Sequence, residues 1–257
     1  MIQKIATIAV FTALEGVRNR LIWVLGATLL SGIVLSSFSG SMAVTETPQI
    51  QLGVLSSFLR LSTVLLMTLF VLNSQAREYE DKGLELLLAL PVPRSGYYFG
   101  KLFGFALLAV LVALCCSLTV ALFQAPLTQT SLWGLSLFYE LMLVIAFCMF
   151  AFIAFHQVPV AFMLVMAFYV LARSITTIQL IGHSPIMPSR DISLRFINQL
   201  IDFIAYLVPS LDQFTRAHWL IYGSGDGQAL ATVLGQGSIY LLLICSASLF
   251  DLYRKKI

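Results

Sequence analysis

Acidic side chains gather in one short stretch of the chain, residues 77–91 (REYEDKGLELLLALP). Glu78, Asp81 and Glu85 follow i, i+3, i+7 spacing, so a helix would place all three carboxylates on one face. Three of the leucines that follow make an apolar face at the same spacing, and Pro91 ends the helix. Such a helix is either a solvated surface, the usual outcome for a run of charges, or a docking surface for another protein.

Three more ionisable residues, Arg60, Glu140 and Arg173, interrupt long apolar stretches. Charges in such places are costly in lipid and usually face a partner or a water-filled cavity. Arg60 and Glu140 lie about 8–11 Å from the outer ends of their stretches at 1.5 Å per residue. We therefore expect an Arg60–Glu140 ion pair, with extension of Arg60 to the outer membrane surface as an equal alternative. Arg173 lies deeper and is a candidate for a transport pathway.

No motif for catalysis, metal binding or nucleotide binding stands out in the chain. Gly96–Lys101 is one residue shorter than a phosphate-binding loop and lacks its Ser or Thr, so we expect no ATP bound by this chain. The three histidines and four cysteines lack the spacing of metal ligands, so no metal site is predicted. Serine-nucleophile motifs and paired intramembrane aspartates are also missing, and we expect no enzyme activity.

The composition assigns the chain to the membrane. Of its 257 residues, 59% are hydrophobic and 11% are charged, too few charges to cover a soluble protein. This excludes a soluble enzyme, a disordered chain and a nucleic-acid-binding protein. Six apolar stretches are long enough to cross a bilayer as helices: 21–38, 55–74, 99–122, 133–155, 160–182 and 229–250. None shows the alternation of a barrel strand, so we predict an all-α integral membrane protein with one domain, residues 1–257.

Basic residues predict the orientation of these helices. Ten of them fall on one side of the membrane: Lys4, Arg18, Arg20, Arg77, Lys82, Arg94, Lys101, Arg254, Lys255 and Lys256. Because basic loops stay in the cytoplasm, we expect both termini there, in a multi-pass protein of the cell inner membrane. The even number of spans agrees with this orientation. The first span resembles an uncleaved signal-anchor more than a cleaved signal peptide.

Two further segments are amphipathic and too short to span. Residues 2–15 predict an interfacial helix with Ile2, Ile5, Ala6, Ala9 and Phe11 close together, or alternatively a cytoplasmic extension of the first span. Residues 193–208 predict an external helix between the fifth and sixth spans. Its polar stripe is formed by Arg195, Asn198, Gln199, Asp202 and Tyr206. It lies on the outer surface or dips into the bilayer and returns, so membrane lipid is a partner.

Residues 78–94 (EYEDKGLELLLALPVPR), followed by Gly100 and Lys101, resemble the signature of ABC-2 type transporter permeases. Members of that family carry an acidic stretch, a glycine and a leucine run that ends in proline. A Gly-Lys pair then opens the third span. The six spans and both amphipathic helices agree with the resemblance over the whole chain. Lys82 and Leu84 depart from the pattern, since acidic or polar residues and threonine are commoner there.

The resemblance implies a transmembrane subunit that exports a substrate and that forms a homodimer or pairs with a second permease. ATP and Mg²⁺ would bind to a separate ATP-binding-cassette ATPase, and this chain would hold no cofactor. The helix between spans 2 and 3 would be the coupling helix, whose ATPase-contacting residues are Glu78, Tyr79, Glu80, Asp81, Gly83 and Glu85.

Within the family, the chain looks most similar to permeases of nitrous-oxide-reductase and copper-enzyme maturation. The alternative is a scaffold that assembles an extracytoplasmic metalloenzyme without transport. In that hypothesis the external helix at 193–208 would bind an extracytoplasmic accessory protein.

Overall fold

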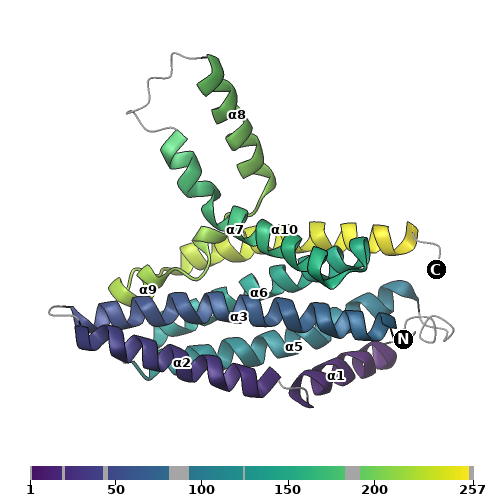
Figure 1. Ribbon diagram of the computed structural model, residues 1–257, viewed down its shortest axis with the longest axis horizontal. Coiled ribbons are helices and arrows are strands. Elements are labelled where there is room, and N and C mark those ends of the chain that lie inside the picture. The colour runs from purple at the N-terminus through teal and green to yellow at the C-terminus, as the bar shows by residue number, and fades with distance from the viewer. Residues whose placement is uncertain are drawn as a thin grey trace.

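The computed structural model describes residues 2–18, 21–42, 46–80, 93–123, 125–182 and 192–254. This part of the chain is helical and contains no strand (Figure 1). In chain order the elements are α1 (Ile2–Arg18), α2 (Leu21–Met42), α3 (Thr47–Glu80), α5 (Arg94–Ala121), α6 (Leu127–Phe155), α7 (Val158–Gly182), α8 (Ile192–Leu207), η1 (Leu211–Gln213), α9 (Ala217–Tyr222) and α10 (Gly227–Arg254).

Six helices are long and apolar enough to cross a membrane, namely α2, α3, α5, α6, α7 and α10, which confirms the six predicted spans. Several extend beyond their apolar stretches. The clearest case is α3, which begins at Thr47 and continues to Glu80. The first residues of the predicted coupling helix are therefore the last turn of α3. The remainder of that helix lies outside the described residues.

The core of the bundle is built from α3, α5 and α6. At least half of the most apolar part of each is buried, whereas under a third is buried in α2, α7 and α10. The outward surfaces of the latter three helices are apolar, as expected for helices that face lipid. The ends of α3 and α10 and the start of α5 lie together with α1 at one end of the bundle (Figure 1). There Arg94 Nη1 donates to the Leu252 carbonyl over 2.8 Å.

Small residues bring α1 against α5. A Cβ at Gly104 would lie 2.5 Å from Thr12 Cβ and 2.8 Å from the Ala9 carbonyl oxygen, and a Cβ at Gly100 would lie 3.0 Å from Ile8 Cβ. The two glycines of α5 thus allow Ile8, Ala9 and Thr12 of α1 to approach its backbone closely. The predicted apolar face of residues 2–15 is divided, because Ala9 is buried and the Phe11 side chain is 68% exposed. The exposed large side chains suit contact with lipid, and the placement of α1 on the membrane surface stays a prediction.

The external helix predicted at 193–208 corresponds to α8, which stands out from the bundle with the end of α7 (Figure 1). Two residues of its polar stripe bind α7: Asn198 Nδ2 donates to the Gly182 carbonyl over 2.9 Å, and Gln179 Nε2 donates to Asp202 Oδ1 over 3.1 Å. The large apolar residues Phe196 and Phe203 are exposed. The polar stripe therefore serves partly to hold α8 on α7.

The close approach of α1 and α5 generates a test. Gly104→Leu places a side chain against the Ala9 backbone, which cannot move aside, so the substitution should lower the free energy of unfolding by about 1–3 kcal/mol. Thermal unfolding of the purified protein in detergent measures this loss. Gly26→Leu in α2 is the matched control, because nothing lies within 4 Å of a Cβ at Gly26. Equal melting temperatures for the two variants would contradict the packing.

Candidate functional site

An irregular segment, residues 208–216, packs among α3, α6 and α7. Its residues Leu211, Phe214 and Thr215 are buried, and Thr215 adopts a left-handed conformation with φ 44°. Backbone carbonyls outside helices need other partners when water is excluded. Two arginines supply them. Arg173 Nη1 of α7 donates to the carbonyls of Leu211 and Phe214, the latter over 3.0 Å. The guanidinium of Arg60 in α3 completes this arrangement, since its Nη1 donates to the Thr215 carbonyl over 3.3 Å.

Glu140 of α6 is the fully buried carboxylate at the centre of this site. Tyr169 Oη donates to Glu140 Oε1 over 2.8 Å, and Thr215 Oγ1 donates to Glu140 Oε2. Arg173 Nη1 lies 3.7 Å from Oε1 and makes the ion pair. Two hydroxyls and one guanidinium therefore compensate the charge. We call Arg60, Glu140, Tyr169, Arg173 and Thr215 the polar cluster.

The polar cluster unites the three predicted intramembrane residues but corrects their pairing. Glu140 pairs with Arg173, while Arg60 binds the backbone of Thr215, whose hydroxyl in turn donates to Glu140. Within the protein, Arg60 Nη1 binds the Thr215 carbonyl, and its Nε is buried and lacks a hydrogen-bond partner among the described residues. Helix depth could be counted from the sequence. The folding of segment 208–216 into the bundle could not, and that segment determines which group each arginine reaches.

The polar cluster fastens one segment to three helices. Asp212 extends it, because Thr176 Oγ1 donates to its Oδ1 over 2.8 Å and Arg216 Nη2 lies 3.7 Å from its Oδ2. Removing one partner from a buried ion pair leaves the other charge uncompensated, which costs more than the pair itself contributes. The polar cluster thus positions the backbone of segment 208–216. Within the described ranges no group of three His, Cys, Asp or Glu side chains is placed to bind a metal.

A second concentration of polar contacts lies at the other end of α3. Lys101 Nζ of α5 makes an ion pair with Glu78 Oε2, and Tyr97 Oη donates to the same oxygen over 3.0 Å. The Lys101 side chain is 5% exposed, so this ion pair is largely shielded from water. The helix before residues 81–92 is thereby joined to the helix after them. Of the residues predicted to contact an ATPase, Glu78 is engaged inside the chain.

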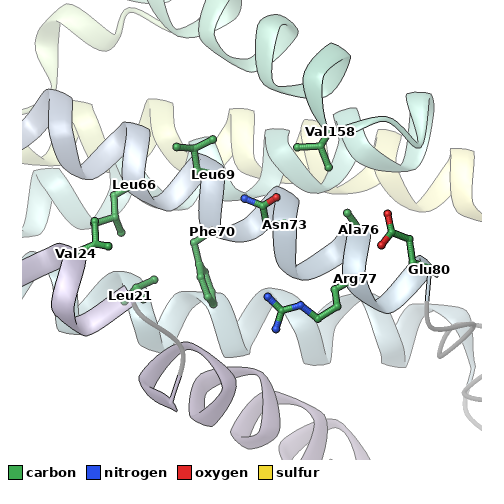
Figure 2. A pocket seen from close by; sticks show the side chains of 10 residues that line it. All are labelled: Leu21, Val24, Leu66, Leu69, Phe70, Asn73, Ala76, Arg77, Glu80 and Val158. Atoms are coloured by element: carbon green, nitrogen blue, oxygen red, sulfur yellow. The ribbon is translucent and has the colours of Figure 1, made fainter.

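The neighbours of Glu78 point elsewhere. The Tyr79 ring meets His156 edge-on at 4.8 Å between ring centroids and approaches Phe152 at the end of α6. Glu80 is exposed and lines a cavity of about 550 Å³ between α2, α3 and the start of α7 (Figure 2). One turn earlier, Ser74 Oγ donates to the Glu15 carboxylate of α1 at 3.2 Å. The other predicted docking residues, Asp81, Gly83 and Glu85, lie outside the described residues.

The family profile of the ABC-2 family transporter protein matches residues 17–183. The chain belongs to the ABC-2 transporter family. The matched region includes α2 to α7, and with them Arg60, Glu140, Arg173 and the Glu78–Lys101 ion pair. No curated protein matches the chain. As an ABC-2 family member with six membrane-length helices, it is a multi-pass membrane protein of the ABC transporter permease type.

Sequence reasoning identified the charged members of the two sites and missed their neutral partners. Tyr169 and Thr215 bind Glu140, and Ser136 Oγ accepts from the Thr215 backbone nitrogen over 2.9 Å. Hydroxyl residues are common in membrane helices, so nothing in the sequence distinguishes these three. Lys101 belonged to the recognised Gly-Lys motif, but only the packing of α3 on α5 shows which carboxylate it meets.

The revised pairing in the polar cluster predicts the outcome of double-mutant cycles. Glu140→Gln leaves Arg173 unpaired, so we expect a loss of about 3 kcal/mol in unfolding free energy. Combining it with Arg173→Gln should recover part of that loss, and combining it with Arg60→Gln should recover less. Denaturant or thermal unfolding in detergent gives the coupling energies. Arg254→Gln, at an exposed position away from the polar cluster, is the control, and stronger coupling to Arg60 would restore the original pairing.

A second cycle tests the Glu78–Lys101 ion pair. Glu78→Gln and Lys101→Met should each destabilise the protein by about 1–3 kcal/mol, because each leaves a shielded charge without its partner. The double variant should lose less than the sum. Glu80→Gln, two residues further along α3 and exposed, should stay within about 0.5 kcal/mol of the parent. Additive losses from Glu78 and Lys101 would show that the two side chains do not interact.

Proposed function

We propose that this chain is the membrane subunit of an ABC exporter and that a separate ATP-binding-cassette ATPase drives it. In this proposal both termini and the 81–92 segment face the cytoplasm at the inner membrane. Two copies, or one copy and a second permease, form the transmembrane unit. The chain binds no nucleotide itself, and ATP with Mg²⁺ belongs to the ATPase.

The observation that carries the proposal is the Glu78–Lys101 ion pair beside the acidic segment of an ABC-2 family member. It joins the helix that enters residues 81–92 to the helix that leaves them. A force applied by an ATPase to that segment would therefore act on α3 and α5 together. Because Glu78 is engaged inside the chain, we assign docking to the residues that follow Glu80, chiefly Asp81 and Glu85.

α3 could also carry movement from the ATPase side of the bundle to the polar cluster. α3 runs without a break from Thr47 to Glu80 and contains both Glu78 and Arg60. These residues are 18 positions apart, which corresponds to about 27 Å along a helix. Movement of the α3 end near the ATPase would reach segment 208–216 through the hydrogen bond from Arg60 to Thr215. Movement of the ATPase would thus shift the polar cluster, which lies about 27 Å along α3 from Glu78.

Co-purification tests the docking assignment. Reversing two charges, with Asp81→Lys and Glu85→Lys together, should abolish binding of an ATPase that carries Walker motifs and is encoded beside this chain. Glu78→Gln should keep the ATPase bound, because its carboxylate binds Lys101 rather than a partner. Affinity capture of the tagged permease from detergent extracts measures the ATPase recovered.

The matched control replaces two exposed acids elsewhere in the chain, with Glu46→Lys and Asp226→Lys together. This control should retain the ATPase. Full recovery of the ATPase with the Asp81 and Glu85 variant would refute the coupling assignment. Failure of the unmodified chain to capture any ATPase would favour the scaffold alternative.

A further inference from the structure

One face of α3 lines the cavity of Figure 2, and its side chains change from apolar to charged along the helix. Its residues recur every three or four positions, as expected for one side of a helix: Leu66, Leu69, Phe70, Asn73, Ala76, Arg77 and Glu80. The first three are apolar, Asn73 is polar, and the last two are charged. Leu66 and Glu80 are 14 positions apart, which corresponds to about 21 Å along the helix.

The other walls of the cavity are apolar. Leu21 and Val24 of α2 and Val158 of α7 face this side of α3. The volume of about 550 Å³ falls in the usual range of small-ligand sites. Figure 2 shows Leu66 and Leu69 toward one end of the cavity, Asn73 between, and Arg77 and Glu80 toward the other. The charged end of the cavity is at the C-terminal end of α3, the end of the bundle where α1 and the last turn of α10 also lie (Figure 1).

The change from apolar to charged residues along this face of α3 resembles the change from acyl chains to headgroups across one leaflet of a bilayer. Half of a bilayer, headgroups included, is about 20–22 Å thick, close to the length of the lined face. We propose that this cavity binds one zwitterionic phospholipid with a primary ammonium headgroup, from the leaflet at the end of the bundle that holds the chain termini. Arg77 binds the phosphate, Glu80 binds the ammonium, and Asn73 meets the ester region. The upper part of an acyl chain packs on Leu69 and Phe70.

The two charges determine the headgroup. A guanidinium binds phosphate through paired N–H donors, and Arg77 is exposed and lines the cavity. Glu80 follows three residues later and lines the same end of the cavity. An anionic glycerol headgroup would meet repulsion from the Glu80 carboxylate, and a choline headgroup has no N–H to donate to it. A primary ammonium satisfies both residues.

Leu69 provides the apolar part of the site. Its side chain is 45% exposed, although it lies in the middle of a spanning helix, so it is available to an acyl chain within the cavity. The site holds whether the bound phospholipid is cargo or a permanent component, and it does not require the ATPase. A failed co-purification experiment would therefore leave the phospholipid site unaffected. A failed lipid-binding experiment would likewise leave the ATPase proposal unaffected.

Native mass spectrometry of the full chain tests the proposal. The purified protein is incubated in mixed micelles with equal amounts of phosphatidylethanolamine, phosphatidylcholine and phosphatidylglycerol that carry the same acyl chains. We expect one phosphatidylethanolamine per chain, enriched about tenfold over each competitor. Arg77→Gln should weaken binding about tenfold, as expected for the loss of one charge-assisted contact. Glu80→Gln should abolish the preference among headgroups.

Two more variants separate the cavity from general attraction to lipid. Leu69→Trp fills the apolar part while keeping every charge, and it should exclude the phospholipid. Arg254→Gln removes another exposed basic residue at the same end of the bundle but away from the cavity, and it should bind as the parent does. Equal binding of the three headgroups, or unchanged binding by the Arg77 and Leu69 variants, would overturn the proposal.

Discussion

The need to satisfy polar groups away from water governs how this bundle is organised. Segment 208–216 leaves the α-helical hydrogen-bonding pattern while packed against α3, α6 and α7, and three of its carbonyls, those of Leu211, Phe214 and Thr215, accept hydrogen bonds from side chains. Arg60 and Arg173 serve them, and the second guanidinium is neutralised in part by Glu140. Each of these three charged side chains thus contacts a backbone carbonyl or a side chain of opposite charge. The last span follows this segment, and its position depends on these contacts.

α3 connects this site with the opposite end of the molecule. It is the longest described helix, it contributes to the core over much of its length, and it carries contacts to α1, α5 and segment 208–216. An unbroken helix that is held at Glu78 by an ion pair and at Arg60 by a hydrogen bond can transmit displacement between these two positions. Changes near Glu78 and changes near Arg60 are therefore mechanically related, which is the property that an ATP-driven membrane subunit requires.

The sequence was sufficient for the spans, because about 20 apolar residues in a row permit little besides a membrane helix. Gly100 and Gly104 lie one turn apart on α5, and two small residues at this spacing permit the close approach of α1. The partner of Glu140 was predicted incorrectly. Arg60 and Arg173 have the same chemistry, and the packing of segment 208–216 and the rotation of each helix decide which of them reaches Glu140. Likewise, the spacing of the acidic residues predicted a shared face that includes Glu78, but pattern alone could not show that the Glu78 carboxylate meets Lys101.

The packing of α1 on α5 has a consequence for the order of assembly. Thr12 and Gly104, which come together in the finished protein, are separated by 92 residues of chain. At the usual pace of synthesis, 5–20 residues per second, about 5–20 s pass between the appearance of α1 and that of its binding surface. Throughout that interval the small-residue side of α1 has no α5 to contact. α1 consequently cannot reach its final position until α5 has been made.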